Sequence, residues 1–388
     1  MRGRHMARRK GAQAKRRRPS SSSAAHNNIG LLRLMLATGV VFGHACGQFG
    51  PGAPFREPIL TLIPGTLDLA SLCLDGFFLI SGWLITMSRL RSRSTADYLC
   101  RRVIRIYPAF LLAYALSIWL IHSLYAAPGS PQWWRLALLQ APPAFQHEGT
   151  WWNANAPLWS LAFEFRCYLM VALLGATGML ARREMILKLA LTLLTLWLLS
   201  RYPPLNWRLH SLQYAQNWPL LYALIGEPAA SLRLFTIFFT GAAGYLYRDD
   251  IERLIDHRAA LVSGLWALLL LGHPSVAEWA ICLVGAPALY WLAFRANLGP
   301  LGQINRRTDI SYGTYIYGWP AGLSLAMAGF NFWPYLAITV ITSWACGWLS
   351  WHLVEKPTKD MLRLPALLIN RLARERSEQR VPASIHSD

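Results

Sequence analysis

The segment Leu31–Phe49 reads LLRLMLATGVVFGHACGQF, an apolar run that nevertheless contains an arginine and a histidine. A hydrocarbon core of about 30 Å is crossed by roughly 20 apolar residues in a helix, so the segment predicts a transmembrane helix. Arg33 and His44 are separated by three helical turns to within roughly 20°, which places both side chains on one face about 16 Å apart. Ionisable groups in such a helix usually face a polar cavity and serve a function. A snorkelling arginine and a histidine bonded to a nearby carbonyl are the structural alternative.

The rest of the chain repeats this apolar pattern. Of the 388 residues, 54% are hydrophobic and only 15% are charged. This composition predicts an all-α, polytopic integral membrane protein with about ten transmembrane helices, and it disfavours a soluble protein. The ten expected spans lie near residues 30–49, 66–88, 106–125, 158–180, 186–201, 232–248, 259–272, 275–294, 310–329 and 333–353.

Charge is distributed unevenly along the chain. The net charge is +19, and a soluble protein this basic would suggest nucleic acid as a partner. Here most of the 38 lysines and arginines fall in segments that face the cytoplasm if the N-terminus lies inside, whereas the outer loops hold only Arg56, Arg135 and Arg208. The positive-inside rule therefore predicts a multi-pass protein of the plasma (inner) membrane with both termini in the cytoplasm.

The two ends of the chain differ from the apolar middle. We expect residues 1–28 to form a disordered basic cytoplasmic arm, residues 29–357 a ten-helix membrane domain, and residues 358–388 a basic cytoplasmic tail. Anionic lipids are the expected partners of the basic ends, and no folded domain for specific nucleic acid binding is predicted. The six cysteines have no paired short spacing, so neither a disulfide framework nor a metal site is expected.

Further ionisable residues lie in or beside the apolar segments. Asp75 is expected near the middle of the second span, where a carboxyl group needs a partner or a proton. Arg101, Arg102 and Arg105 follow at helical neighbour spacings and are expected to form one cationic patch at the inner interface. Guanidinium groups suit bidentate phosphate binding, although arginines that flank a span also act as topology anchors.

Glu164 is expected to reach the same depth as His44. Counted from an outer surface near residue 158, Glu164 lies roughly 9 Å deep, and His44 also lies about 9 Å from that surface. A carboxylate beside a histidine orients the ring and raises its basicity, as proton abstraction requires. Arg166 is expected near this depth as well, and a structural pair between Arg166 and Glu164 is the alternative.

Taken in order, six short motifs resemble the acyltransferase-3 family of integral membrane O-acyltransferases. The motifs run from about residue 30 to residue 357, and each is weak alone whereas the ordered set is specific. One departure is Gly318, where many members carry histidine. The motifs are Arg33-(ten)-His44, Phe77-Phe78-(two)-Ser81-Gly82, Arg102-(two)-Arg105-Ile106-Tyr107-Pro108, Leu158-Trp159-Ser160-Leu161-(two)-Glu164, Ser311-Tyr312-Gly313-(one)-Tyr315 and Glu355-Lys356-Pro357.

The resemblance implies transfer of a short acyl group, commonly acetyl, from cytoplasmic acyl-coenzyme A to a hydroxyl of a glycan or glycan-like acceptor. His44 is then expected to act as the base or, alternatively, as a covalent acyl carrier. Its expected catalytic partners are Glu164 and Asp75. The donor phosphates are expected on Arg33, Arg101, Arg102 and Arg105. The same motifs make Trp159, Tyr312 and Tyr315 candidates for substrate contacts.

Two other classes of protein account for part of the pattern. A transporter of a lipid-linked sugar or organic anion also has many spans with central charges, whereas a membrane scaffold leaves the buried charges unexplained. Tyr317 and Trp319 are expected to be interfacial aromatic residues. The acceptor, the acyl length and the oligomeric state are not determined, but acceptor choice is expected in the loops 126–157 and 202–231, the first of which is rich in tryptophan.

Overall fold

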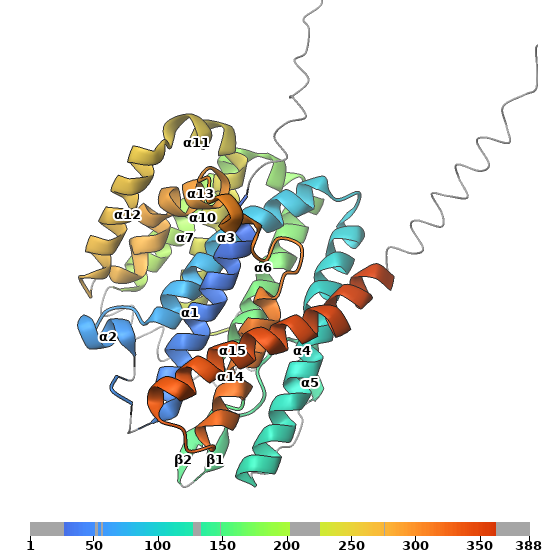
Figure 1. Ribbon diagram of the computed structural model, residues 1–388. Helices are drawn as coiled ribbons and strands as arrows, with labels where there is room; N and C mark the ends of the chain where they lie inside the picture. Colours follow the sequence, from blue (N-terminus) through green and yellow to red (C-terminus); the bar gives the residue numbers. More distant parts are fainter. Residues whose placement is uncertain are drawn as a thin grey trace, which may run out of the picture.

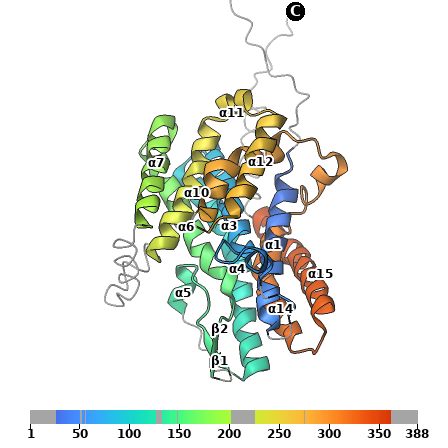
Figure 2. The same ribbon diagram turned by 90° about the vertical axis from the view of Figure 1, so that its left-hand side faces the viewer.

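The computed structural model is a bundle of helices (Figures 1 and 2). It describes residues 27–50, 53–55, 57–126, 133–147, 149–201, 226–274 and 276–361. The predicted basic arm, most of the basic tail and residues 202–225 of the second predicted acceptor loop lie outside the described residues. The α-helices are α1 (Ile29–Phe49), α2 (Pro58–Leu62), α3 (Leu69–Arg91), α4 (Thr95–Tyr125), α5 (Trp133–Ala137), α6 (Trp159–Ala176), α7 (Arg183–Ser200), α10 (Pro228–Leu246), α11 (Arg248–Leu254), α12 (His257–Leu271), α13 (Ala286–Phe294), α14 (Ser311–Ala326) and α15 (Phe332–Ser350).

Each of the ten segments expected to span a membrane coincides with helical structure. Within the described residues, six helical segments are long and apolar enough to cross a bilayer, and the bent pair α11 and α12 would make a seventh. The prediction of an all-α, multi-pass membrane protein is thereby confirmed at this level. The number of ten spans and the sides on which the termini lie stay predictions.

Small residues allow the central helices to pack closely. A Cβ atom on Gly82 of α3 would collide with the carbonyl of Phe238 in α10, and a Cβ atom on Gly241 would collide with the carbonyl of Leu79. Close approach of helix backbones at small residues is typical of helix pairs within membranes. The α3–α10 contact therefore depends on these two glycines.

Helix α1 lies against α3 and α14, which in turn packs on α15 and α4. A Cβ atom on Gly43 would lie 3.3 Å from the backbone nitrogen of Ala70. Likewise, a Cβ atom on Gly39 would meet the sulfur of Cys73, and one on Gly76 would lie 2.9 Å from Leu36. Helices α1 and α3 are therefore antiparallel neighbours, with the end of α1 beside the start of α3.

The loop that follows α4 contains a short antiparallel hairpin, which the all-α prediction did not include. Strand β1 (Phe145–His147) pairs with β2 (Thr150–Trp152), with Phe145 opposite Trp152. The hairpin lies at the opposite end of the bundle from α11 (Figures 1 and 2). Tyr125 at the end of α4 packs against Phe145 with ring centroids 5.3 Å apart, so the hairpin is held to the bundle.

Helix α6 begins inside the bundle rather than at its surface. A 3₁₀ turn, η1 (Ala156–Leu158), precedes it, and Leu158 is fully buried. The buried Asn155 side chain donates hydrogen bonds of 3.0 Å to the Ile316 carbonyl and to the Ser117 hydroxyl. The chain therefore enters the bundle in an irregular conformation, and α6 begins only after this entry. The sequence instead predicts that the fourth helix starts at the outer surface near residue 158.

Candidate active site

A cavity of about 430 Å³, including the open space at its mouth, lies between α1, α3, α6 and α14. It brings together four of the ten residues predicted for the site, namely Arg33, Glu164, Tyr312 and Tyr315. The other side chains that line it are Leu74, Phe77, Phe78, Ser81, Ser160, Leu161 and Ser311. Apolar walls with a few convergent polar groups are typical of a ligand-binding pocket.

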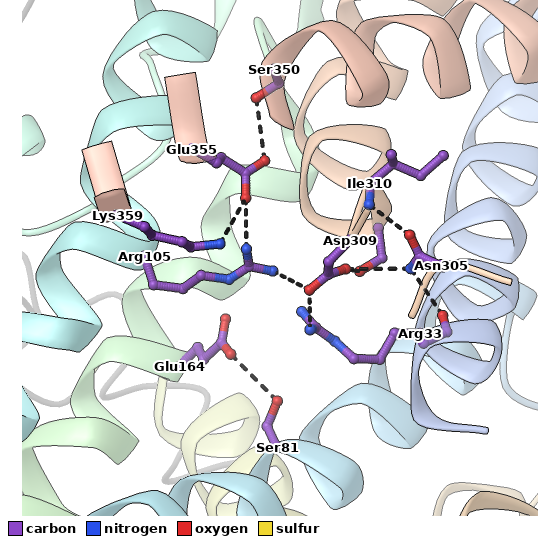
Figure 3. Close-up of polar contacts among 12 residues, drawn as sticks. Arg33, Ser81, Arg105, Glu164, Asn305, Asp309, Ile310, Ser350, Glu355 and Lys359 are labelled. Atoms are coloured by element: carbon purple, nitrogen blue, oxygen red, sulfur yellow. Dashed lines mark hydrogen bonds and ion pairs between the residues drawn. The ribbon is translucent and has the colours of Figure 1, made fainter. Parts of the chain in front are cut away.

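Glu164 is held in this cavity by two hydroxyl groups. Tyr168, one turn later in α6, donates a 2.6 Å hydrogen bond to Glu164 Oε1. Ser81 of α3 donates to the same oxygen at 3.4 Å, as Figure 3 shows. The guanidinium of Arg166 instead lies over the ring of Phe163, 4.7 Å from its centroid. The described contacts of Glu164 thus come from hydroxyl groups.

The tyrosines of α14 are anchored through their hydroxyl groups. Tyr315 is within 2.7 Å of the Ser160 hydroxyl and donates to the Pro157 carbonyl at 3.1 Å. Tyr312 donates to the Ile106 carbonyl at 2.9 Å. Both rings are buried, so they form fixed walls of the cavity.

A cluster of five charged residues adjoins the cavity at the end where α1 begins (Figure 3). Arg105 of α4 reaches Asp309 at 2.5 Å and Glu355 at 2.7 Å, while Arg33 reaches Asp309 at 2.7 Å. Lys359 lies 4.0 Å from Glu355. Burial alone would raise the pKa of Asp309, but the charges of Arg33 and Arg105 outweigh burial and hold that pKa well below its usual range. The cluster therefore links α1 and α4 to the residues just before α14 and just after α15 through ionised groups.

The three arginines of α4 have different partners, although the sequence predicts a single patch. Arg101 is half exposed and pairs with Asp97 at 2.6 Å, one turn earlier. Arg102 lies about 6 Å from the ring centroids of Tyr98 and Tyr168, and among the described residues its buried Nε has no hydrogen-bond partner. Arg105 belongs to the charged cluster. Successive residues point about 100° apart around a helix, and this separates Arg101 from Arg102.

Asp75 has the partner that its burial requires. The carboxylate is fully buried and accepts two hydrogen bonds from Arg233 of α10, at 3.1 and 2.9 Å. Arg233 also donates to the Ser71 carbonyl at 3.2 Å. This bidentate pair joins α3 to α10 close to the glycine contact between the same helices, and in the structure Asp75 does not line the cavity.

His44 lies near the far end of α1 from Arg33. Its ring meets the edge of Trp319 of α14, with centroids 5.1 Å apart, and its backbone neighbour Gly43 lies beside Ala70. Among the described residues no hydrogen bond to the imidazole is found. Asp68 caps α3 by accepting a 2.5 Å hydrogen bond from the Ser71 nitrogen, and because it stands two residues before Ala70 it brings a carboxylate to the level of His44.

His44 and Glu164 therefore lie at different depths in the bundle. His44 is level with the start of α3, near Ala70, whereas Glu164 contacts Ser81. Ser81 is about eleven residues further along α3, or roughly 16 Å along the helix axis. The sequence expectation of a common depth fails because α6 begins inside the bundle, and this start moves Glu164 toward the charged cluster.

The remaining predicted residues are placed as follows. Trp159 is partly exposed and packs on Phe163 with centroids 5.4 Å apart, and it does not line the cavity. Tyr317, expected at a membrane interface, is instead buried and donates to the Ala109 carbonyl at 3.3 Å. Trp319 donates to the Asn153 carbonyl at 2.9 Å, so it joins the loop after α4 to His44.

Sequence reasoning missed three acidic residues that matter here: Asp68, Asp309 and Glu355. Glu355 is the first residue of one of the six motifs and Asp309 lies two residues before another, but neither was given a role. Acidic residues next to apolar segments that also contain arginines could have suggested ion pairs. Asp68 carried the ordinary signal of a helix N-cap. Within the described residues, no group of three His, Cys, Asp or Glu side chains is arranged to hold a metal ion.

Comparison with known proteins places the chain in a family. A family model described as an acyltransferase domain matches residues 26–352, and the chain belongs to this acyltransferase-3 family. It is 25% identical over 385 residues to nodulation protein 10 of Rhizobium leguminosarum bv. viciae, covering 88% of this chain and 95% of that protein. It is 26% identical over 344 residues to an O-acetyl transferase of Shigella phage Sf6, covering 84% and 93%. No solved structure matches the chain.

Family membership confirms the prediction of an acyltransferase, the class of enzyme that the ordered motifs implied. The match spans the lining of the cavity, His44 and three of the five residues of the charged cluster, Arg33, Arg105 and Asp309, whereas Glu355 and Lys359 follow it in the chain. The particular donor, the acceptor and the roles of single residues require further argument.

Proposed function

We propose that the protein transfers an acetyl group from acetyl-coenzyme A to a hydroxyl of a glycan or glycan-like acceptor. The relative from phage Sf6 carries the name O-acetyl transferase, and the family supplies the reaction class. The membrane is proposed to be the plasma (inner) membrane with both termini in the cytoplasm, so that the Arg33 end of α1 faces the cytoplasmic donor.

The observation that carries the proposal is a single face of α14 that runs from the cavity to His44. Tyr312 and Tyr315 line the cavity, and Trp319, one turn later, touches the imidazole. Leu74, at the His44 side of the cavity, is about four residues from Ala70, so the cavity ends roughly 6 Å short of the His44 level. A donor whose phosphates lie near Arg33 would thus extend its thin pantetheine arm toward His44.

The donor phosphates are proposed to bind at the charged end of the cavity. Three cationic side chains in the cluster, Arg33, Arg105 and Lys359, face two carboxylates, those of Asp309 and Glu355. Arg102 adds a guanidinium that donates to the Ser88 hydroxyl at 3.4 Å and whose Nε has no partner among the described residues. Such an excess of positive charge suits a phosphate ester. Arg101 is the weakest of the predicted phosphate ligands because its guanidinium already donates two hydrogen bonds to the Asp97 carboxylate.

His44 is proposed to act as the general base. It removes the proton from the acceptor hydroxyl while the hydroxyl oxygen attacks the thioester carbonyl; the carbon–oxygen bond forms, the carbon–sulfur bond breaks, and the coenzyme A thiolate takes the proton. The loop after α4 is proposed to guide the acceptor, because Trp319 contacts both His44 and Asn153 of that loop. Glu164 lies too far from His44 to orient it and is proposed to contact the donor within the cavity.

The test is transfer of labelled acetyl from acetyl-coenzyme A by the full-length protein in liposomes, with bacterial surface glycans as acceptors. We expect His44→Ala to lose activity by about 10² to 10⁴-fold, as general base removal does. His122→Ala is the control, because His122 is exposed near the end of α4. Wild-type activity in His44→Ala would overturn the assignment, and absence of donor binding by the wild type would favour the transporter class instead.

A further inference from the structure

A second and larger cavity lies at the same end of the bundle as Arg33 but on the other side of α3. It encloses about 1050 Å³, including the open space at its mouth, and is lined by residues of α1, α3, α10, α11 and α13. Ser81 lines the first cavity and Trp83 lines the second. Side chains two positions apart in a helix point about 200° apart, so these two residues face nearly opposite sides of α3. Among the described residues, none lines both cavities. The second cavity is therefore a separate site.

Aromatic rings form a rigid floor in this cavity. Trp83 stacks on Phe294 with centroids 4.6 Å apart, and lies 4.9 Å from Tyr290 and 5.7 Å from Tyr245. Trp83, Tyr245 and Tyr290 are each more than nine-tenths buried. Rings that hold one another in this way give a preformed apolar surface.

One polar group on this floor is unsatisfied. The Tyr290 hydroxyl is buried and, among the described residues, has no hydrogen-bond partner. It lies close to α10, where a Cβ atom on Gly244 would be 2.6 Å from it. A buried hydroxyl without a partner costs free energy, so a ligand that accepts its hydrogen bond would be favoured.

The mouth of the cavity is cationic. Arg91, Arg248 and Arg295 line it together with a single acidic residue, Glu252. Arg248 lies over the ring of Tyr245, 4.8 Å from the centroid, and Arg295 donates to the Glu252 carbonyl at 2.8 Å. These contacts fix two guanidinium groups at the rim. Arg248 also lies 3.5 Å from the exposed carboxylate of Asp249, which offsets part of its charge, whereas Arg295 donates to a backbone carbonyl and keeps its charge. A basic pocket between helices at the membrane surface suits an anionic headgroup.

We infer that this cavity binds a phosphate ester with an apolar body, in which the arginines hold the phosphate and Tyr290 donates a hydrogen bond to the ligand. A membrane phospholipid is the source that the position favours. Helix α11, which supplies Arg248, is strongly charged along its length, as a helix at a membrane surface is. The apolar side chains of Ile29, Met87 and Ile251 continue the lining beside the aromatic floor.

The experiment is a binding titration of the purified full-length protein in detergent. The probes are dioctanoyl phosphatidylglycerol, its zwitterionic phosphatidylcholine counterpart, and adenosine 3′,5′-bisphosphate as a soluble phosphate ester. Arg248→Gln should weaken binding of the anionic lipid about fivefold, since a basic residue near the surface contributes about that factor. Tyr290→Phe, which removes only the hydroxyl, should weaken it by about the same factor. Arg253→Gln on the same helix, outside the lining, is the control and should change it less than about twofold.

The outcomes separate the two sources. Loss of phosphatidylglycerol binding in both variants assigns the site to a lipid phosphate, and loss of bisphosphate binding in both assigns it to a soluble phosphate ester at the same place. The inference is overturned if neither probe loses affinity in Arg248→Gln and Tyr290→Phe, or if phosphatidylcholine binds as well as phosphatidylglycerol. The melting temperature of each unliganded variant checks that it is folded. Because the readout is binding, the result is independent of acyl transfer.

Discussion

The two ends of α1 hold their ionisable residues in different ways. Around Arg33, ion pairs of 2.5 to 2.7 Å join Arg33, Arg105, Asp309 and Glu355 into one network (Figure 3). Around His44, the described ring contact is the edge of Trp319, and the nearby start of α3 is capped by Asp68. The first end is fixed by mutual neutralisation, whereas at the second the imidazole has no hydrogen bond from the part of the chain that the structure describes. The difference suggests that positioning and proton transfer are divided between the two ends.

The largest expected effect is at the centre of the network. Arg105→Ala leaves the carboxylates of Asp309 and Glu355 without their main partner, so the free energy of unfolding should fall by about 3–5 kcal/mol. Arg101→Ala is the matched control on the same helix, because its half-exposed pair with Asp97 should contribute at most about 1 kcal/mol. Denaturant unfolding in detergent micelles measures both. Equal losses in the two variants would remove the distinction between a network and separate surface charges.

The buried pair of α3 and α10 tests whether a charge in the bundle is structural or catalytic. Asp75→Ala leaves Arg233 uncompensated and should destabilise the protein by about 3 kcal/mol, whereas the double variant Asp75→Leu, Arg233→Met should recover most of this loss. Transfer activity of the double variant is the second measurement. If it keeps near wild-type activity, the sequence-based prediction of a catalytic Asp75 is wrong; if it is stable but inactive, that prediction gains support.

The smallest effect sharpens the description of the His44 end. Asp68→Asn keeps an N-cap oxygen, so the free energy of unfolding should change by less than about 0.5 kcal/mol. Loss of the negative charge should nevertheless lower the transfer rate at neutral pH about tenfold, because the carboxylate stabilises the imidazolium formed during proton abstraction. Asp256→Asn, the equivalent cap of α12, should leave the rate unchanged. An unchanged rate in Asp68→Asn would show that His44 acts without this carboxylate.

Much of the fold and part of the site could be predicted from the sequence. The positions of the helices followed from apolar segment lengths, and the separation of Arg33 and His44 on one helix followed from helical periodicity. The cavity also unites Arg33, Glu164, Tyr312 and Tyr315, which the ordered motifs had selected together. These features depend on residues near one another in the chain or on the order of the motifs.

Other features could be known only from the packing. Asp75 and Arg233 are 158 positions apart, and Arg105 and Asp309 are 204 apart, so no local periodicity indicates that they meet. The depth of Glu164 depended on the irregular entry before α6, which is held by a hydrogen bond from Asn155 to Ile316, 161 positions away. For this reason, counting residues inward from the outer surface gave the wrong depth for Glu164.

The sequence by itself determined that the chain forms apolar helices that cross a membrane, that it carries ionisable groups within them, and that it belongs among acyltransferases. The length of an apolar segment and the spacing of residues along a helix are local properties, and they do not depend on which helices pack together. Only the tertiary structure decided which charges neutralise one another and that the ring of His44 meets Trp319 rather than Glu164. A buried charge is stabilised by whatever partner the packing brings to it, and that partner is set by the arrangement of the whole bundle.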